Sequence, residues 1–447
     1  MKFYDREKEM EILRRATRVA IIGRRRVGKT RLVEETLKPI TLFIPSEKNE
    51  ALICRDWINE IKKRRYIPES LSTMRDIVEF LMEENEVIFI DELQNAMKIN
   101  PSFLSDLQRL IDSHRNAKLV VTGSLISMSK KMVEDYRSPL YGRFDYAIKL
   151  TELSFPTVYE IMQDLGYEIE DAVVMWAVFG GLPKYYETLE KFKVPVMDFI
   201  RMMFYEEPYP MLSEVMMMLK EEVGREYKVY FSILQAIAEG NSRMGEIASY
   251  MGLKSTDISK YIHALYNDYE LISRRKDAFG KGKYRYYISQ NLIDFWFRTV
   301  WKNYPKYELG QVKFSEEEIK RYVGRKYEQL VEQFAQNFVD FKIKSIGKLW
   351  GKYEGKEKGK ESFEIDLAAV GDEKIAIFEV KWSELDEKEV EREFNKLKEK
   401  SGAIKDSREK ELVIVARKVK KKGKNVYDLG DIENIIKREF NPNMVLF

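Results

Sequence analysis

The sequence predicts an α/β protein whose N-terminal part is built on a parallel sheet. Short apolar runs rich in Val and Ile lie there at residues 18–23, 40–44, 86–91 and 118–123. Each run is flanked by turn residues, and helical patterns separate the runs. Such runs are typical of strands that are buried on both faces, as the strands of a parallel sheet are. A length of 447 residues predicts about three domains at roughly 150 residues each. A second α/β pattern near the C-terminus therefore indicates a separate domain.

The composition excludes several classes of protein. Hydrophobic residues make up 44% of the chain and aromatic residues 13%, which excludes wholesale disorder. The single cysteine, Cys54, excludes a disulfide framework and a Cys-based zinc site, and two histidines argue against a His-rich metal centre. Because 77 Lys and Arg nearly balance 74 Asp and Glu, a nucleic-acid surface requires local clustering of cations.

Neither a secretory leader nor a membrane span is expected. Residues 1–13 are charged and lack the apolar segment of a signal peptide. No stretch approaches the ~20 apolar residues that a membrane helix needs. We therefore expect a soluble, cytoplasmic protein without a membrane partner.

Changes of pattern along the chain predict five parts. The α/β pattern ends near residue 150, and a Met-rich helical pattern follows it. A helix, helix, turn, helix pattern with a basic hairpin comes next, and an aromatic bridging segment leads to the second α/β pattern. The five expected ranges are 1–150, 151–222, 223–295, 296–320 and 321–447.

A glycine-rich motif follows the first predicted strand and opens a helix. It fits G-x-x-x-x-G-K-[ST] at every fixed position. The motif consists of Gly23, Arg24, Arg25, Arg26, Val27, Gly28, Lys29 and Thr30. The glycines allow a tight turn whose N–H groups face phosphate oxygens, and the helix N-terminus adds positive potential. Lys29 is expected to reach the β- and γ-phosphates and the Thr30 hydroxyl to bind Mg²⁺, so the motif predicts an ATP site.

Two carboxylates after another apolar strand complete the predicted ATP site. Asp91 would hold Mg²⁺ through water, and Glu92 would orient or deprotonate the attacking water. Such a pair is usually a solvated strand end, but here it follows a phosphate loop at a plausible distance. Ser124, after the next strand, would lie near the γ-phosphate as a sensor, although a Gly-Ser turn after a strand is common.

Over roughly residues 1–220 the chain resembles the archaeal ATPase family, a branch of the AAA+/STAND-type P-loop ATPases. The resemblance rests on motifs that occur in order: FYDRE at 3–7, the phosphate loop, IDELQ at 90–94, TGS at 122–124, PLYGR at 139–143 and GGLPKYY at 180–186. It implies a P-loop ATPase core with a helical lid.

The same resemblance implies roles for four further residues. Phe3, Arg6 and Pro183 would help to enclose the adenine. Arg143 would lie near the phosphates or at a subunit boundary. The alternative for Arg143 is a surface salt bridge, and the alternative for Pro183 is a helix-breaking turn.

Residues 244–285 predict a winged helix. Ile258, Ile262 and Leu265 are spaced to face the core, which leaves polar residues of the same helix pointing outward, as in a recognition helix that contacts the major groove. The hairpin that follows carries Arg274, Arg275, Lys276, Lys281, Lys283 and Arg285. Six cations on one hairpin predict contacts with DNA phosphates. The alternative is a winged helix that packs against the ATPase or mediates assembly.

The C-terminal part carries acids and a lysine on two apolar strands. Asp366 lies within 363–369, and Glu379 and Lys381 lie within 375–382. Because i and i+2 share one face of a strand, Glu379 and Lys381 should point the same way. The short connection between the two runs predicts that the strands pair, which would bring Asp366 near Glu379.

This arrangement, together with Glu328 on an upstream helix, resembles the PD-(D/E)xK nuclease superfamily and its restriction-endonuclease-like α/β fold. The resemblance implies that Asp366 and Glu379 bind Mg²⁺ or Mn²⁺, with Glu328 completing the metal shell. Lys381 would position or activate water and stabilise charge, which suits phosphodiester hydrolysis. The residue before Asp366 is Ile, so the literal Pro-Asp pair is missing.

The motifs together predict an ATP-hydrolysing switch that associates with DNA and carries a nuclease-like domain, with DNA cleavage left open. The expected partners are ATP or ADP and double-stranded DNA, and a homo-oligomer is left open as well. The alternative is a non-nuclease regulatory or scaffold ATPase whose C-terminal domain binds a partner or DNA. A hairpin with exposed charges, or a degenerate nuclease fold, would produce the same C-terminal pattern.

Overall fold

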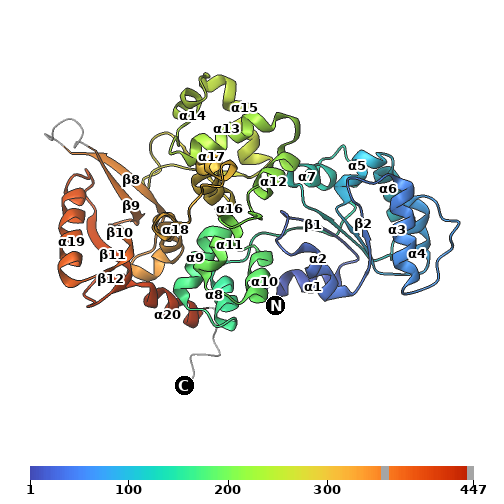
Figure 1. Ribbon diagram of the computed structural model, residues 1–447, viewed down its shortest axis with the longest axis horizontal. Helices are drawn as coiled ribbons and strands as arrows, with labels where there is room; N and C mark the ends of the chain where they lie inside the picture. The colour runs from blue at the N-terminus through green and yellow to red at the C-terminus, as the bar shows by residue number, and fades with distance from the viewer. Residues whose placement is uncertain (354–361, 440–447) are drawn as a thin grey trace. The chain divides into compact units, whose positions relative to one another are not determined.

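The computed structural model describes residues 1–353 and 362–439 and divides into two compact units (Figure 1). Unit 1 contains residues 1–153, 181–188 and 220–224. Unit 2 contains residues 154–180 and 189–219 and the chain from 225 onward. The segment 151–222, predicted as a lid, thus contributes residues to both units. In the described residues, no helix is both long enough and apolar enough to cross a bilayer.

Unit 1 is built on a five-stranded parallel sheet of order β2-β3-β4-β1-β5. Its strands are β1 (Arg18–Ile22), β2 (Ile40–Phe43), β3 (Ile88–Asp91), β4 (Leu119–Gly123) and β5 (Tyr146–Lys149). The four strands expected from apolar runs are confirmed. The fifth strand, β5, has no apolar run because its residues are largely exposed at the edge of the sheet.

Helices pack on both faces of this sheet (Figure 1). They are α1 (Glu7–Arg15), α2 (Lys29–Leu37), α3 (Glu50–Lys62), α4 (Met74–Glu83), α5 (Ala96–Ile99), α6 (Phe103–Ser113) and α7 (Ile126–Glu134). Trp57, Ile77 and Leu107, from three of them, are 3% exposed or less and belong to one apolar core with the strands. Burial of each such side chain stabilises the unit by about 1.5–3 kcal/mol.

The first part of unit 2 is helical. It comprises α8 (Phe155–Asp164), α9 (Ile169–Phe179), α11 (Val196–Phe204), α13 (Tyr227–Ala238), α14 (Met244–Tyr250) and α15 (Ser255–Asn267), while α10 (Pro183–Phe192) and α12 (Glu214–Val223) have residues in both units. The prediction that Ile258, Ile262 and Leu265 face the core is confirmed, since all three side chains of α15 are buried. The antiparallel hairpin of β6 (Ile272–Arg275) and β7 (Arg285–Ile288) follows.

A second five-stranded sheet forms the C-terminal part of unit 2, with the order β12-β11-β10-β9-β8. Its strands are β8 (Ser345–Lys352), β9 (Ser362–Val370), β10 (Lys374–Leu385), β11 (Glu409–Val419) and β12 (Val426–Asp428), and its helices are α18 (Glu316–Phe334), α19 (Glu387–Gly402) and α20 (Leu429–Glu439). β9 pairs with β8 and β10 antiparallel, whereas β11 pairs with β10 and β12 parallel. The predicted pairing of the strands that carry Asp366 and Glu379 is confirmed.

A buried ionic cluster joins α18 to the short helix α16 (Asn291–Phe295). Asp294 receives Lys326 Nζ at 2.8 Å and Arg298 Nε at 2.7 Å. Asp294 is 5% exposed and Lys326 is 2% exposed. These two cations hold the pKa of the Asp294 carboxyl below its usual value, although burial alone would raise it. The cluster ties the aromatic bridging segment to the C-terminal domain.

Candidate functional site

The phosphate loop connects β1 to α2 and closes around Lys29. Arg26 and Gly28 have left-handed backbone, with φ of 71° and 93°. A Cβ on Gly23 would lie 2.6 Å from Leu150 O, so this position also requires glycine. Lys29 Nζ donates to Gly23 O at 2.7 Å and to Arg24 O at 3.0 Å. Burial lowers the pKa of the Lys29 ammonium, which therefore gains from an anionic partner.

The Thr30 hydroxyl and the Asp91 carboxylate, which are predicted to bind Mg²⁺, lie within hydrogen-bond distance of each other. Thr30 Oγ1 donates to Asp91 Oδ2 at 2.8 Å, and the Thr122 hydroxyl donates to the other Asp91 oxygen. Thr122 can reach Asp91 because β4 lies between β1 and β3 in the sheet. Burial raises the pKa of Asp91. Oxygen donors in this arrangement fit Mg²⁺, which polarises phosphate oxygens when it is bound.

Glu92 is held by side chains from the neighbouring strand end and from its own turn. Its backbone is left-handed, with φ of 60°. Ser124 Oγ donates to Glu92 Oε2 at 2.5 Å, and Gln94 Nε2 donates to the same oxygen. The predicted sensor and the predicted base are therefore hydrogen-bonded to each other. The sequence did not predict that Gln94 holds Glu92. The only indication in the sequence was that Gln94 belongs to the IDELQ motif.

Further residues of unit 1 surround the phosphate loop. Arg26 Nη1 donates to the Tyr185 hydroxyl at 2.7 Å, and Arg25 pairs with Glu221 at 2.7 Å. Val27 is buried. A Cβ on Gly28 would lie 3.8 Å from Pro183 Cγ, so Pro183 lies against the start of α2. The loop is therefore covered by residues that are distant in sequence, and the adenine-enclosing role of Pro183 stays a prediction.

The N-terminal segment, predicted to enclose the adenine, is anchored to this region by two arginines. Arg6 Nη2 donates to Thr151 O at 2.5 Å and is buried. The Phe3 ring lies 5.7 Å from the Arg31 guanidinium of α2, which also pairs with Glu187 at 2.5 Å. Arg31 follows the phosphate-loop motif directly and was not among the predicted residues. Motif matching stops at Thr30 and therefore carried no signal for it.

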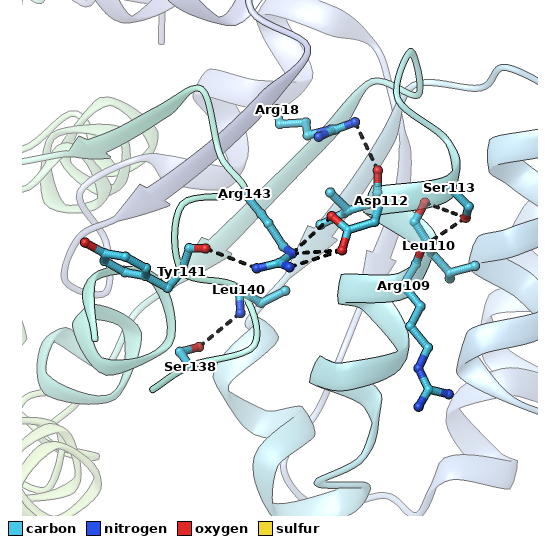
Figure 2. Close-up of polar contacts among 10 residues, drawn as sticks. Arg18, Arg109, Leu110, Asp112, Ser113, Ser138, Leu140, Tyr141 and Arg143 are labelled. Carbon is cyan, nitrogen blue, oxygen red and sulfur yellow. Dashed lines mark hydrogen bonds and ion pairs between the residues drawn. The ribbon is translucent and has the colours of Figure 1, made fainter. Parts of the chain in front are cut away.

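Arg143 does not lie beside the phosphate loop of its own chain. Its guanidinium pairs with Asp112 at the end of α6, with Nε and Nη2 at 3.2 and 3.1 Å (Figure 2). This pair lies next to the start of β1, because Arg18 Nη2 donates to Ile111 O at 3.1 Å and Asp145 accepts from Arg18 N. The phosphate loop follows the other end of β1. In this structure Arg143 forms the surface salt bridge that was the alternative, and its place near the phosphates or at a subunit boundary stays a prediction.

In the C-terminal sheet, Asp366 and Glu379 lie next to the paired residues Leu367 and Phe378. Asp366 Oδ2 accepts from Val380 N at 3.0 Å. Glu379 Oε1 accepts from Lys381 Nζ at 2.5 Å, and its Oε2 accepts from Lys400 Nζ at 2.8 Å. Burial raises the pKa of Asp366, with the Glu379 charge adding to the effect. The two lysines outweigh burial and keep the pKa of Glu379 low.

Glu328, the third predicted metal ligand, forms an ion pair with a lysine. Lys348 Nζ lies 2.8 Å from Glu328 Oε2 and 2.8 Å from Glu364 Oε1. Burial raises the pKa of Glu328 to about 7. Within residues 1–353 and 362–439, no group of three or more His, Cys, Asp or Glu side chains is placed to hold a metal ion. Asp366 and Glu379 supply the hard oxygen donors that Mg²⁺ or Mn²⁺ prefers, but lysines occupy both Glu379 oxygens.

The chain is similar to known proteins over most of its length. Residues 16–159 match a family described as AAA domain, and residues 296–393 match one described as Archaea bacterial proteins of unknown function. The chain is 32% identical to the uncharacterized protein MJECL04 of Methanocaldococcus jannaschii, over 97% of this chain and 99% of that one.

Comparison with solved structures finds similar architectures over about two thirds of the chain. The Walker-type ATPase PABY2304 of Pyrococcus abyssi has a TM-score of 0.52 at 20% identity, over 66% of this chain and 96% of that chain. The ORC2 protein of Aeropyrum pernix has a TM-score of 0.47 at 14% identity, over 69% of this chain and 96% of that one. The first similarity supports the fold of a P-loop ATPase.

Proposed function

Because the chain belongs to the same family as the Methanocaldococcus jannaschii protein and contains an AAA domain of the P-loop ATPase type, we propose that it hydrolyses ATP in unit 1 and uses the bound nucleotide to control the association of unit 2 with DNA. The observation that supports ATP hydrolysis in unit 1 is the hydrogen bond from Thr30 Oγ1 to Asp91 Oδ2, 2.8 Å long, near the buried ammonium of Lys29. The basic hairpin supports the association with DNA.

The residues of unit 1 divide the work of hydrolysis. Lys29 exchanges the carbonyl oxygens of Gly23 and Arg24 for phosphate oxygens, an exchange that desolvation of its ammonium favours. Thr30 and Asp91 hold Mg²⁺. Glu92 accepts the proton of the attacking water, and Ser124 and Gln94 orient the Glu92 carboxylate by donating hydrogen bonds to it.

The switch is tested by the affinity of the full chain for a labelled DNA duplex. Affinity is measured by fluorescence anisotropy with Mg-ADP, with a non-hydrolysable ATP analogue and without nucleotide. We expect the two nucleotide states to differ in affinity and the difference to vanish in Lys29→Ala. Equal affinity in all three states, with ATP hydrolysis intact, would remove the switch and leave a plain ATPase.

A second function, metal-dependent cleavage of nucleic acid by the C-terminal domain, is favoured by one arrangement. Asp366 lies on β9 beside Glu379 and Lys381 on β10, with the Lys381 ammonium 2.5 Å from Glu379. An acid pair with an adjacent cation suits attack on a phosphodiester. The competing proposal is a non-nuclease binding domain, which fits the two lysines on Glu379 because its charge is satisfied without a metal.

Nicking of supercoiled plasmid with Mn²⁺ distinguishes these two proposals. Cleavage by the wild type and loss of cleavage in Asp366→Ala support the nuclease. The matched control is Asp372→Ala, an exposed acid in the turn between the same two strands. No cleavage by the wild type with Mn²⁺ or Mg²⁺ favours the binding domain.

A further inference from the structure

The hairpin loop between β6 and β7 is docked on the edge of the C-terminal sheet. Ala278 N donates to Lys348 O at 3.0 Å, and Ser345 Oγ donates to Ala278 O at 2.6 Å. Both partners belong to β8, the outermost strand of that sheet. Ala278 is fully buried and shares an apolar core with Ile365 and Ile377. The loop therefore covers an edge that would otherwise expose unpaired backbone groups.

Two cations of the hairpin also contact the C-terminal domain. The Arg285 guanidinium lies 3.8 Å from the centre of the Trp350 ring on β8. Arg275 Nη1 lies 2.6 and 2.5 Å from the two carboxylate oxygens of Glu332 on α18. Cation–π and charge-assisted contacts of this kind hold the hairpin against the C-terminal domain. The hairpin and the C-terminal sheet thus form one continuous wall.

A cavity of about 330 Å³ lies against this wall, between the hairpin, α18 and β8. Glu328 and Asp366, two of the acids predicted to bind metal, line the same cavity. Six basic and four acidic side chains line it in all. Four of the cations are paired with acids of the domain, namely Arg275, Arg298, Lys326 and Lys348.

Lys276 and Arg325 are the remaining cations of the cavity. Neither forms an ion pair within residues 1–353 and 362–439, and both are exposed. Lys276 comes from the hairpin between β6 and β7 and Arg325 from α18, so two different elements bring these charges to the cavity. The cavity therefore has a surplus of positive charge, which attracts an anion.

The size and lining of the cavity define the chemistry of that anion. A volume of about 330 Å³ lies at the lower end of small-molecule sites, which range over roughly 300–1,000 Å³. Tyr287 and Trp350 add aromatic surface to the lining, and bases stack on such side chains. One phosphate and one base match the cavity, whereas a length of duplex does not enter it.

We propose that this cavity binds one phosphorylated nucleotide, with its phosphate on Lys276 and Arg325 and its base against Tyr287 and Trp350. The nucleotide is either a free nucleoside monophosphate or the 5′ end of a single strand, which share this chemistry. The proposal rests on the proposed action of the C-terminal domain on nucleic acid, since Glu328 and Asp366 open into the same space. It concerns binding alone, and Lys276 and Arg325 need no metal for it.

Calorimetry with the full chain tests the proposal in EDTA, with excess ADP to fill the phosphate loop of unit 1. The probes are dTMP, thymidine, and a thymidine decanucleotide with and without its 5′ phosphate. We expect dTMP or the phosphorylated strand to bind and the two probes without a terminal phosphate to bind roughly tenfold more weakly or not at all, because charge-assisted contacts to the phosphate are lost. Binding of dTMP alone identifies the free nucleotide as the ligand, and binding of the phosphorylated strand alone identifies the strand end.

The double variant Lys276→Ala, Arg325→Ala should lower this affinity by roughly tenfold or more. Arg321→Ala, at an exposed arginine of α18 outside the cavity lining, is the matched control and should bind as the wild type does. Equal binding by the double variant and the wild type, or no preference for the phosphorylated probes, would overturn the proposal. Because metal is absent, failure here is separate from failure of plasmid cleavage, which would count against the nuclease alone.

Discussion

Thr30 and Asp91 are joined by a hydrogen bond of 2.8 Å although they lie 61 positions apart in the sequence. The contact exists because β1 and β3 are parallel strands separated only by β4, so their carboxyl ends meet at one edge of the sheet. Lys29, on the same turn as Thr30, is buried within the phosphate loop. We expect single substitutions at this edge of the sheet to change ATP binding or ATP hydrolysis.

Replacing Lys29 by Ala should abolish ATP binding, because the cation for the β- and γ-phosphates is lost. The matched control is Lys98→Ala, an exposed lysine on α5 of the same unit, which should bind ATP as the wild type does. Binding is measured with a fluorescent ATP analogue. Hydrolysis by Lys29→Ala at the wild-type rate would show that the ATP site has been assigned to the wrong loop.

Glu92→Gln should bind ATP but lower kcat by about 10²-fold or more, because general-base catalysis contributes roughly 10²–10⁴-fold. The amide keeps the shape of the side chain and cannot accept the proton of water. Steady-state hydrolysis and ATP affinity are measured on the same preparation. A variant with unchanged kcat contradicts the role of Glu92.

Neutralising Lys281 and Lys283 together should weaken duplex binding. These hairpin cations are exposed and lie outside the docked part of the hairpin. If both contact phosphates, the slope of log K against log salt should become shallower by roughly 1.8, at about 0.9 per contact. A gel-shift titration between 50 and 200 mM salt, taken as approximate limits, measures the slope. An unchanged slope would leave the hairpin with docking as its only role.

Asp294→Asn should destabilise unit 2 by about 3–5 kcal/mol, because the change leaves the ammonium of Lys326 buried without a counter-charge. The matched control is Glu316→Gln on α18, whose pair with Lys320 is solvent-exposed and contributes about 0.3–0.5 kcal/mol. Urea unfolding followed by tryptophan fluorescence measures both. A loss below about 1 kcal/mol for Asp294→Asn would mean that solvent reaches the cluster.

The Asp294 cluster also predicts a pH dependence of stability. Lys326 and Arg298 hold the pKa of Asp294 below its usual value, so the folded state binds the proton less tightly than the unfolded chain does. The resulting stabilisation is present above the unfolded pKa of about 3.9 and is lost as pH falls through the lower folded pKa. Urea midpoints of the wild type and Asp294→Asn should therefore converge as pH is lowered below about 4.

Local motifs predicted the phosphate loop, because such a loop is made by consecutive residues. Gly23 to Thr30 form the turn and the first residues of α2, and the left-handed backbone at Gly28 is one that glycine permits. The four buried strands were predictable for a similar reason, since strands covered on both faces must be apolar. β5 escaped prediction because it is an edge strand with exposed residues.

Only the tertiary structure decided which distant charges meet. Arg143 pairs with Asp112 near the start of β1, and no spacing in the sequence indicates that partner. Lys400 reaches Glu379 because α19 packs on β10, which places a lysine where a metal ligand was expected. Side-chain partners depend on how elements pack, and the sequence pattern fixes only which face of each element is buried.

The sequence by itself determined the elements of this protein: the phosphate loop, the acids at the strand ends and the basic hairpin. The tertiary structure decided what the hairpin does with its cations. Ala278 docks on β8, so Arg275 and Arg285 contact Glu332 and Trp350, and Lys276 faces a cavity shared with Asp366. The physical reason is that burial of a sheet edge is a long-range event, whereas motifs and periodicity describe only neighbours along the chain.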